Sequence, residues 1–259
     1  MLDTKLDHVL LFQKIGEIDY SKVRDQLDDG RAVILNLEFE DSFANLAAIP
    51  EGHYDEELDS LARAIEADNR EIWLRPLHEF NGNWYNWGVL YPGNNKSDFA
   101  PAWRYLVTFF MNRDVPVKFQ LNYNRFNGEN DTTPFSEVYP GDEYVDMVVI
   151  TTYNRAYTDE WHQYWRTFSE EFQDAYDQVT SLTNKPIGVA EMSSTSNGGN
   201  KPEWIEEAFR SLDDDFPQVE QVTWFFYNRP VGDLTWDWDL NTDEEIEAFK
   251  HGLSLIEVR

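Results

Sequence analysis

Several kinds of residue and pattern are missing from this chain of 259 residues, and each absence excludes a class of protein. There is no cysteine, which excludes disulfides, thiolate nucleophiles and cysteine-based metal sites together. No apolar run approaches the roughly 18 residues of a membrane-spanning helix, so we expect no membrane partner. The five histidines show no zinc-ligand spacing, and the Gly-x-Ser-x-Gly motif of serine hydrolases does not occur. We therefore expect neither a metal nor an organic cofactor.

Positive charge is also scarce. Lys and Arg number 21 against 49 Asp and Glu, which gives a formal net charge of −28 spread along the whole chain. Such a surface repels phosphate backbones and anionic lipids, so nucleic acid is not an expected partner either. Because like charges destabilise a compact chain unless salt screens them, the composition favours a halophilic protein. An ordinary acidic secreted enzyme is the alternative.

Apolar and aromatic residues are plentiful, at 41% and 15% of the chain, and they suffice for a packed core. Short apolar runs alternate with amphipathic stretches of helical period, which is typical of buried parallel strands covered by helices. The predicted strands cover residues 8–13, 32–38, 71–76, 117–122, 145–151, 186–191 and 221–226. The predicted helices cover roughly 20–29, 54–67, 97–112, 159–182, 202–213 and 242–256. Asp19, Ser97 and Thr242 are the expected N-caps, and Pro202 suits a first helical turn.

This alternation predicts an α/β fold with a parallel sheet, either closed as a (β/α)8 TIM barrel or open and doubly wound. No glycine-rich phosphate fingerprint opens a helix, which counts against the nucleotide-binding open sheet. We find no linker, repeat or low-complexity segment, and we predict a single domain over residues 1–259. A closed barrel has eight strands and the pattern gives seven, so we expect the first strand to be degenerate or to precede residue 1.

Two glutamates, Glu79 and Glu191, close apolar strands, and barrels carry their catalytic residues at the carboxyl ends of strands. A carboxylate is costly to desolvate there unless it is paired or used. Cleavage of a glycosidic bond requires two such groups, one protonated to assist the leaving oxygen and the other ionised. The alternative is that both are buried ion-pair partners of Arg75 or His78.

The loop after Glu79 is rich in aromatic residues, Trp84, Tyr85 and Trp87 among them, and also in Gly and Asn. Trp and Tyr rings offer flat apolar faces that stack on sugar rings. Cores are rarely built from Gly- and Asn-rich loops, so we interpret Trp84 as a sugar platform. For Tyr85 and Trp87 a core position is an equal alternative.

These segments together resemble glycoside hydrolase family 26, which contains β-mannanases, β-1,3-xylanases and mixed-linkage β-glucanases. The resemblance runs in order through about residues 70–228. It rests on four stretches: Arg75-Pro76-Leu77-His78-Glu79-Phe80-Asn81-Gly82 with Trp84 and Trp87-Gly88; Tyr139 to Asp146 with Tyr153-Asn154; Pro186 to Glu191; and Trp204-Ile205 with Val222 to Phe225. The His-Glu-x-Asn-Gly-x-Trp stretch is the most specific of these, and the others support it.

The resemblance implies a (β/α)8 barrel and a retaining double displacement, with Glu79 as the acid/base and Glu191 as the nucleophile. It further implies that Tyr153 orients Glu191, that Trp84 and Trp224 line the sugar subsites, and that Arg75 and His78 give polar support. Trp87 also belongs to the expected binding residues. The pattern departs from the family at Asn36-Leu37-Glu38-Phe39-Glu40-Asp41, where many mannanases carry a histidine. This departure weakens the mannan assignment and leaves the hydrolase chemistry untouched.

We therefore expect a monomeric endo-β-glycanase acting on a neutral polysaccharide, with β-1,4-mannan or glucomannan as the first candidate substrate. Mixed-linkage β-1,3/1,4-glucan and β-1,3-xylan are the alternatives, and a catalytically silent carbohydrate-binding barrel is a further one. A polymer substrate favours a secreted protein, although residues 1–10 (MLDTKLDHVL) do not read as a signal peptide.

Overall fold

The computed structural model describes residues 4–40, 45–160, 162–231 and 234–256, which form two compact units. The N-terminal unit comprises the described residues within 6–149 and 178–186. The C-terminal unit comprises those within 1–5, 150–177 and 187–259. Strand β5 (Met147–Asn154) and helix α4 (Phe168–Leu182) run through both units.

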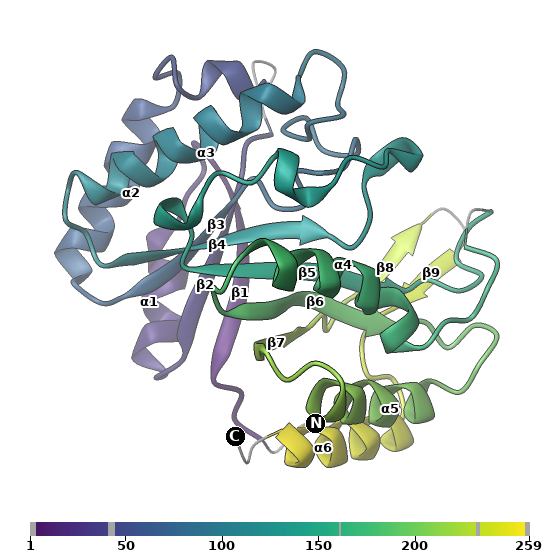
Figure 1. Cartoon of the computed structure of the whole chain (residues 1–259). Coiled ribbons are helices and arrows are strands. Elements are labelled where there is room, and N and C mark those ends of the chain that lie inside the picture. The colour runs from purple at the N-terminus through teal and green to yellow at the C-terminus, as the bar shows by residue number, and fades with distance from the viewer. Residues whose placement is uncertain (1–3, 41–44, 161, 232–233, 257–259) are drawn as a thin grey trace. The chain divides into compact units, whose positions relative to one another are not determined.

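The N-terminal unit alternates strands and helices (Figure 1). Its elements are β1 (His8–Lys14), α1 (Tyr20–Asp28), β2 (Ala32–Glu38), the 3-10 turn η1 (Leu46–Ala48), α2 (Asp55–Asp68), β3 (Ile72–Pro76), α3 (Lys96–Met111) and β4 (Val117–Asn124). The strands β1, β2, β3 and β4 are neighbours in that order, and each pairs in parallel with the next. Between β4 and β5 the chain forms only the short 3-10 turns η2 (Gly128–Asn130), η3 (Phe135–Glu137) and η4 (Asp142–Tyr144).

The C-terminal unit continues the same alternation. It contains β6 (Ile187–Ser194), α5 (Lys201–Asp214), β7 (Val219–Trp224), the antiparallel pair β8 (Asn228–Val231) and β9 (Leu234–Asp237), and α6 (Asp243–Ile256). Strand β6 pairs in parallel with β7. All eight residues of β6 are buried, as expected of a strand covered on both faces.

Local sequence explains most of the helices. In α2 the buried residues Leu58, Leu61, Ala62 and Ile65 recur at helical spacing and form one apolar face. The helix ends at Asn69, whose left-handed backbone (φ 59°) is one that Asn tolerates well. Asp19 caps α1 by accepting from the Ser21 amide, and Pro202 lies in the first turn of α5, as predicted.

The structure confirms all seven predicted strands to within three residues at either end, and it differs from the sequence analysis in three places. The helix predicted over 159–182 begins only at Phe168. Asn95, not Ser97, is the N-cap of α3, where Asn95 and Asp98 form a reciprocal capping box. The hairpin of β8 and β9 was not predicted, because its two strands are only four residues long. In the described parts of the chain, no helix is both long and apolar enough to span a bilayer.

Candidate active site

The backbone turns sharply just after β3, at the segment that carries Glu79. Leu77 and Glu79 both have left-handed backbones, with φ of 55° and 52°, which cost of the order of 1 kcal/mol each in residues other than glycine. The Leu77 amide still donates to Leu37 on β2, and the Glu79 amide donates to Asn122 on β4 at 3.1 Å. The neighbouring strands therefore hold a strained turn in place, and such strain gathers at functional sites.

Glu79 lies buried in this turn, with 9% of its surface exposed. The indole Nε1 of Trp84 donates to its Oε2 at 2.7 Å. Trp84 itself is 39% exposed, so one part of its ring faces solvent while its polar edge holds the carboxylate. Gly82 makes this possible, because a Cβ at that position would lie 2.5 Å from the Trp84 ring. Trp84, expected from the sequence to be a sugar platform, is thus also in direct contact with Glu79.

His78, next to Glu79, is fully enclosed by aromatic rings. The ring centroids of Tyr85, Trp87 and Phe12 lie 4.6, 5.2 and 5.8 Å from that of His78. Burial, together with the nearby Arg75 charge, lowers the pKa of His78 to about 3. Neither ring nitrogen has a hydrogen-bond partner among the described residues. The imidazole is therefore neutral across the ordinary pH range.

Arg75 and Trp87 occupy interior positions. Arg75 has no exposed surface, and its Nε and Nη2 donate to the Gln120 Oε1 at 3.1 and 2.8 Å. Trp87 is 1% exposed, and its Nε1 donates to the backbone oxygen of His78 at 2.8 Å. Its ring stacks on that of Tyr85 at 4.5 Å. Both side chains thus support the segment that carries His78 and Glu79.

Asn81 ties the loop after β3 to the loop after β4. Its Oδ1 accepts from the Asn124 amide at 2.8 Å, and its Nδ2 donates to the backbone oxygens of Asn124 and Phe126. The second loop also carries Phe126, whose ring lies 6.0 Å from the Trp84 ring and is 38% exposed. Asn81 therefore fixes the position of an exposed aromatic pair beside Glu79.

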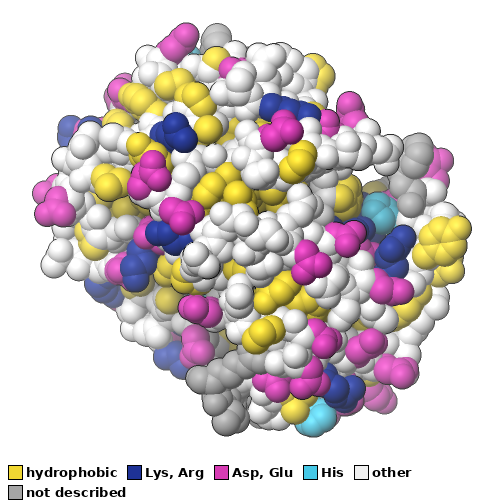
Figure 2. Space-filling view, in the orientation of Figure 1, with side chains coloured by type: hydrophobic (Ala, Val, Ile, Leu, Met, Phe, Trp, Pro, Cys, Tyr) yellow, Lys and Arg dark blue, Asp and Glu magenta, His cyan; other side chains and the backbone are white. Residues whose placement is uncertain are grey.

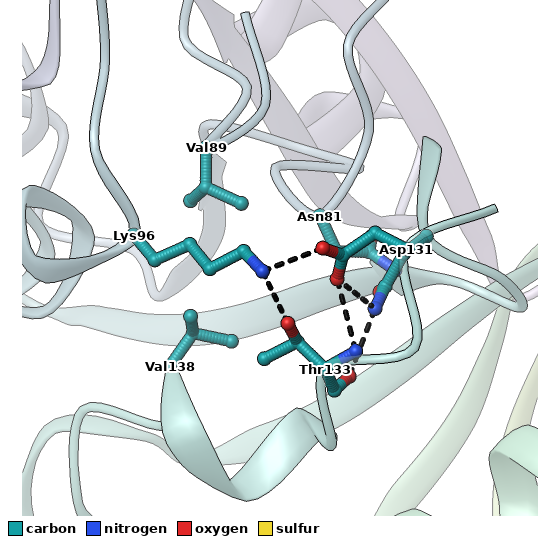
Figure 3. Close-up of a pocket in the computed structure, with 7 residues that line it drawn as sticks. Asn81, Val89, Lys96, Asp131, Thr133 and Val138 are labelled. Carbon is teal, nitrogen blue, oxygen red and sulfur yellow. Dashed lines mark hydrogen bonds and ion pairs between the residues drawn. The ribbon is translucent and has the colours of Figure 1, made fainter. Parts of the chain in front are cut away.

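A polar cluster below this junction lines a small pocket with Asn81 (Figure 3). Lys96 forms an ion pair with Asp131 at 2.6 Å and also donates to the Thr133 hydroxyl. The hydrogen bond from Lys96 is the main reason why the pKa of Asp131 lies well below its usual value. Sequence analysis missed this cluster. The Asp-x-Thr spacing, whose Asp131 side chain accepts from the Thr133 amide at 2.9 Å, is the only local signal for it.

The C-terminal unit carries the other predicted carboxylate. Glu191 lies within β6, is 6% exposed, and accepts a hydrogen bond from the Tyr153 hydroxyl at 2.8 Å on its Oε2. Strand β6 continues for three residues beyond Glu191, where the sequence analysis ended it. The structure thus brings Tyr153 and Glu191 together as the family resemblance implied.

Tyr153 is held by aromatic neighbours that include a residue missed by sequence analysis. The Trp238 ring lies 5.0 Å from the Tyr153 ring, and that of Phe225 lies 6.0 Å away. Trp224 is 6% exposed, and its Nε1 donates to the Trp238 backbone oxygen at 3.2 Å. In the sequence, Trp238 stands between two aspartates and looks like part of a solvated turn, yet it is buried.

The predicted site residues therefore form two groups, each within one unit. Arg75, His78, Glu79, Trp84 and Trp87 belong to the N-terminal unit, and Tyr153, Glu191 and Trp224 belong to the C-terminal unit. Each group has one buried carboxylate that accepts a hydrogen bond from an aromatic side chain. Among the residues described, no cluster of three or more His, Cys, Asp or Glu side chains could hold a metal ion.

Comparison with known proteins defines the class to which this fold and these residues belong. The sequence profile of glycosyl hydrolase family 26 matches residues 52–252. The chain belongs to this family. Within the described residues, seven parallel strands alternate with helices, which is the family's (β/α)8-type fold with one strand fewer than a complete barrel.

Two individual proteins of known name are similar to this chain in sequence. Endoglucanase H of Acetivibrio thermocellus is 36% identical over 235 residues, which are 89% of this chain and 25% of that protein. A mannan endo-1,4-beta-mannosidase of Bifidobacterium adolescentis is 26% identical over 67% of this chain and 19% of its own length. The chain thus spans a quarter or less of these two relatives.

Solved structures of family members share the fold. GH26C from Muricauda superposes with a TM-score of 0.66 at 17% identity, covering 95% of this chain and 77% of that one. The Bacillus subtilis mannanase BCman gives a TM-score of 0.61 at 17% identity, covering 96% of this chain and 76% of that one.

Proposed function

We propose that the chain is a retaining endo-β-glycanase, with Glu79 as the general acid/base and Glu191 as the nucleophile. One observation carries the proposal: each glutamate is a buried carboxylate on or just after a parallel strand, with one oxygen fixed by an aromatic donor. The two donors are the Trp84 indole and the Tyr153 hydroxyl, neither of which carries a charge. Carboxylates placed in this way are suited to reaction at an anomeric carbon.

The proposed reaction has two steps. In the first, the Glu191 carboxylate attacks the anomeric carbon, the glycosidic C–O bond breaks, and Glu79 gives its proton to the leaving oxygen. In the second, Glu79 takes a proton from water, the water oxygen attacks the anomeric carbon, and the ester bond to Glu191 breaks. Two inversions at one carbon give net retention. Tyr153 holds the attacking group in one orientation, and Trp84 does the same for the acid.

The proposed substrate is a neutral β-linked glycan, and the relatives supply two candidates. A glucan is favoured by the relative named endoglucanase, which is the more similar of the two described and covers most of this chain. The absence of a histidine after Leu37 points in the same direction. Mannan, the first candidate from the sequence, is favoured by the relative named mannan endo-1,4-beta-mannosidase. Because such polymers are too large to enter a cell, we also propose that the protein acts outside it.

Sugar rings in this proposal stack on Trp84 and Phe126. Both rings are more than a third exposed; Trp84 contacts Glu79, and Phe126 lies 6.0 Å from the Trp84 ring. Trp87, with no open ring face, acts instead by fixing the backbone of His78.

The test assigns a role to each glutamate. Reducing-sugar release is measured on lichenan, glucomannan, mannan and β-1,3-xylan, and the anomer formed first is identified by NMR. We expect Glu79→Ala to lose about 10²–10⁴-fold on polysaccharide, because general acid catalysis is lost, but to retain activity on dinitrophenyl glycosides, whose leaving group needs no proton. Azide should restore turnover of this variant and yield the β-glycosyl azide. Glu191→Ala should be inactive on both substrates, and azide should give the α-glycosyl azide.

Glu171→Gln is the matched control, because Glu171 is as buried as Glu191 but lies on α4 and pairs with Arg166. Its activity should equal that of the wild type. Activity that survives Glu191→Ala, or an inverted first product, would refute the mechanism. A wild-type chain that binds glycans and cleaves none would instead be a carbohydrate-binding barrel.

A further inference from the structure

Lys201, the first residue of α5, is a lysine whose position is unfavourable for two reasons, its burial and its place at a helix N-terminus. Its side chain has no exposed surface, and burial lowers its pKa from the usual value. A cation at a helix N-terminus also opposes the helix dipole. Glu245 lies 3.4 Å away and offsets part of this cost. Because both burial and the helix dipole disfavour a lysine at this position, its hydrogen bonds are expected to have a role elsewhere in the C-terminal unit.

Those contacts are with the backbone on either side of Trp238. The Lys201 Nζ donates to the backbone oxygen of Asp239 at 2.6 Å and also to that of Asp237. The oxygen between them, that of Trp238, accepts from the Ser193 hydroxyl at 2.6 Å and from the Trp224 indole. Three successive carbonyls are thus fixed by side chains from α5, β6 and β7. We call residues 237–239 with these donors the Trp238 clamp.

The Trp238 clamp is connected to the proposed nucleophile, Glu191, through the side chain of Tyr153. Ser193 lies two residues after Glu191 on the same strand, β6, and both residues are buried. The Trp238 ring is 3% exposed and packs 5.0 Å from the ring of Tyr153, whose hydroxyl donates to Glu191. The backbone held by Lys201 therefore determines where the Tyr153 ring can lie.

We propose that Lys201 is a positioning residue for hydrolysis: through the Trp238 clamp it fixes Tyr153, and through Tyr153 it fixes the Glu191 carboxylate. This inference rests on the proposed function of Glu191. Lys201 touches neither substrate nor reacting atoms.

The experiment compares Lys201→Met, Tyr153→Phe and the double variant, assayed on the glycan that the wild type cleaves. Methionine keeps the length and apolar stem of lysine but donates to none of the carbonyls. We expect each single variant to lose about 10–100-fold in kcat/KM, because a small displacement of a reacting group has effects of this size. Losing the Tyr153 hydrogen bond disfavours the ionised nucleophile, so the acidic limb of the pH profile should move to higher pH in both. The double variant should be no worse than Tyr153→Phe, because both act through one contact.

Lys250→Met is the control, since Lys250 is on α6 and pairs with Glu247 at the surface of the same unit. It should match the wild type. If circular dichroism shows that Lys201→Met does not fold, Trp238→Phe is used in its place to test the proposal. This substitution puts a smaller ring against Tyr153 and leaves the backbone carbonyls of residues 237–239 in place. The proposal is overturned if the folded variant keeps the wild-type acidic limb, or if its loss multiplies fully with that of Tyr153→Phe. Failure of the proposed function has another signature, an active Glu191→Ala or an inactive wild type.

Discussion

At the scale of single residues, His78 and Glu79 illustrate how one turn gives neighbouring side chains different chemistry. Adjacent residues of a regular strand point to opposite faces. The left-handed backbones at Leu77 and Glu79 break that alternation, and both His78 and Glu79 end up buried. His78 is enclosed by aromatic rings and stays neutral, whereas Glu79 receives a hydrogen bond from Trp84. The strained turn thus places two neighbouring side chains in different buried environments.

The buried, neutral His78 predicts a specific pH dependence of stability. Its pKa is about 3 in the folded chain and about 6.5 in the unfolded chain, so between these values the unfolded chain binds more protons. Stability therefore rises with pH through this window and is lost as the pH falls. From pH 8 to pH 5 this residue should remove about 2 kcal/mol from the free energy of unfolding.

Urea unfolding of the wild type and His78→Gln at several pH values measures this contribution. Glutamine does not titrate, so the variant should lose about 2 kcal/mol less than the wild type over that range. Other groups titrate alike in both proteins and cancel in the difference. Parallel curves for the two proteins would show that the pKa of His78 is the same in the folded and unfolded chain.

Contacts between residues close in sequence are easier to anticipate than contacts with distant backbone atoms. Trp84 was expected to be a sugar platform in the loop after Glu79, and the structure shows that its indole also donates to Glu79, five residues away. Lys201, Asn81 and Trp238 were missed, because their roles arise from contacts with backbone atoms far along the chain. A lysine at a helix start, or a tryptophan between two aspartates, gives no sign in the sequence that it will be buried.

At the scale of elements, short apolar runs located the strands well, whether the strand is buried throughout, as β6 is, or mostly half-buried, as β1 is. The apolar start of β6, Ile187 to Ala190, is easy to recognise, whereas its polar end, Ser193 and Ser194, lay beyond the predicted strand. Residues 159–167 carry polar and aromatic residues at near-helical spacing, yet the helix begins only at Phe168. There Thr167 and Glu170 cap the start reciprocally, the Glu170 amide donating to the Thr167 hydroxyl and the Thr167 amide to the Glu170 carboxylate. Local capping chemistry, not period, set that boundary.

The helices share an electrostatic asymmetry that predicts how one of them can be stabilised. Their first turns are often acidic, as in α2, α4 and α6, but none of the six described α-helices has a cation in its last turn. Helix α5 instead ends at Asp213, Asp214 and Asp215, of which the last two are exposed, and their charge opposes the helix dipole. Asp214→Lys should therefore raise the free energy of unfolding by about 1 kcal/mol in dilute buffer.

Urea unfolding in dilute buffer and in molar KCl checks this value. The gain should shrink in high salt, because the interaction with the dipole is screened. Glu203→Lys, at an exposed position in the first turn of the same helix, is the matched control and should destabilise. An equal gain at both salt concentrations would point to a cause other than electrostatics.

At the scale of the whole molecule, the negative charge of Asp and Glu is far larger than the positive charge of the Lys and Arg residues that pair with them. Asp and Glu side chains are scattered over the visible face in Figure 2, with a few Lys and Arg among them. Cations are shared where they occur: Arg70, for example, contacts Asp28 at 2.8 Å and Asp68 at 2.5 Å. Even if every cation were paired, the formal charge of −28 would remain. Repulsion on this scale is long-ranged and is distributed over the surface.

Salt should consequently stabilise the protein, although it weakens individual ion pairs. Exposed pairs contribute only about 0.2–1 kcal/mol each, and the cations are too few for their loss to outweigh relief of the general repulsion. The Debye length falls from about 10 Å at 0.1 M to about 3 Å at 1 M, so the repulsion is largely screened in molar KCl. We predict a higher Tm and a larger free energy of unfolding in 2 M KCl than in dilute buffer, measured by circular dichroism. Sucrose at equal osmolality, which stabilises without screening charge, is the control and should give a smaller gain. Equal stability in dilute buffer and in KCl would mean that local pairing has already balanced the charge, and that this chain is an acidic protein without adaptation to salt.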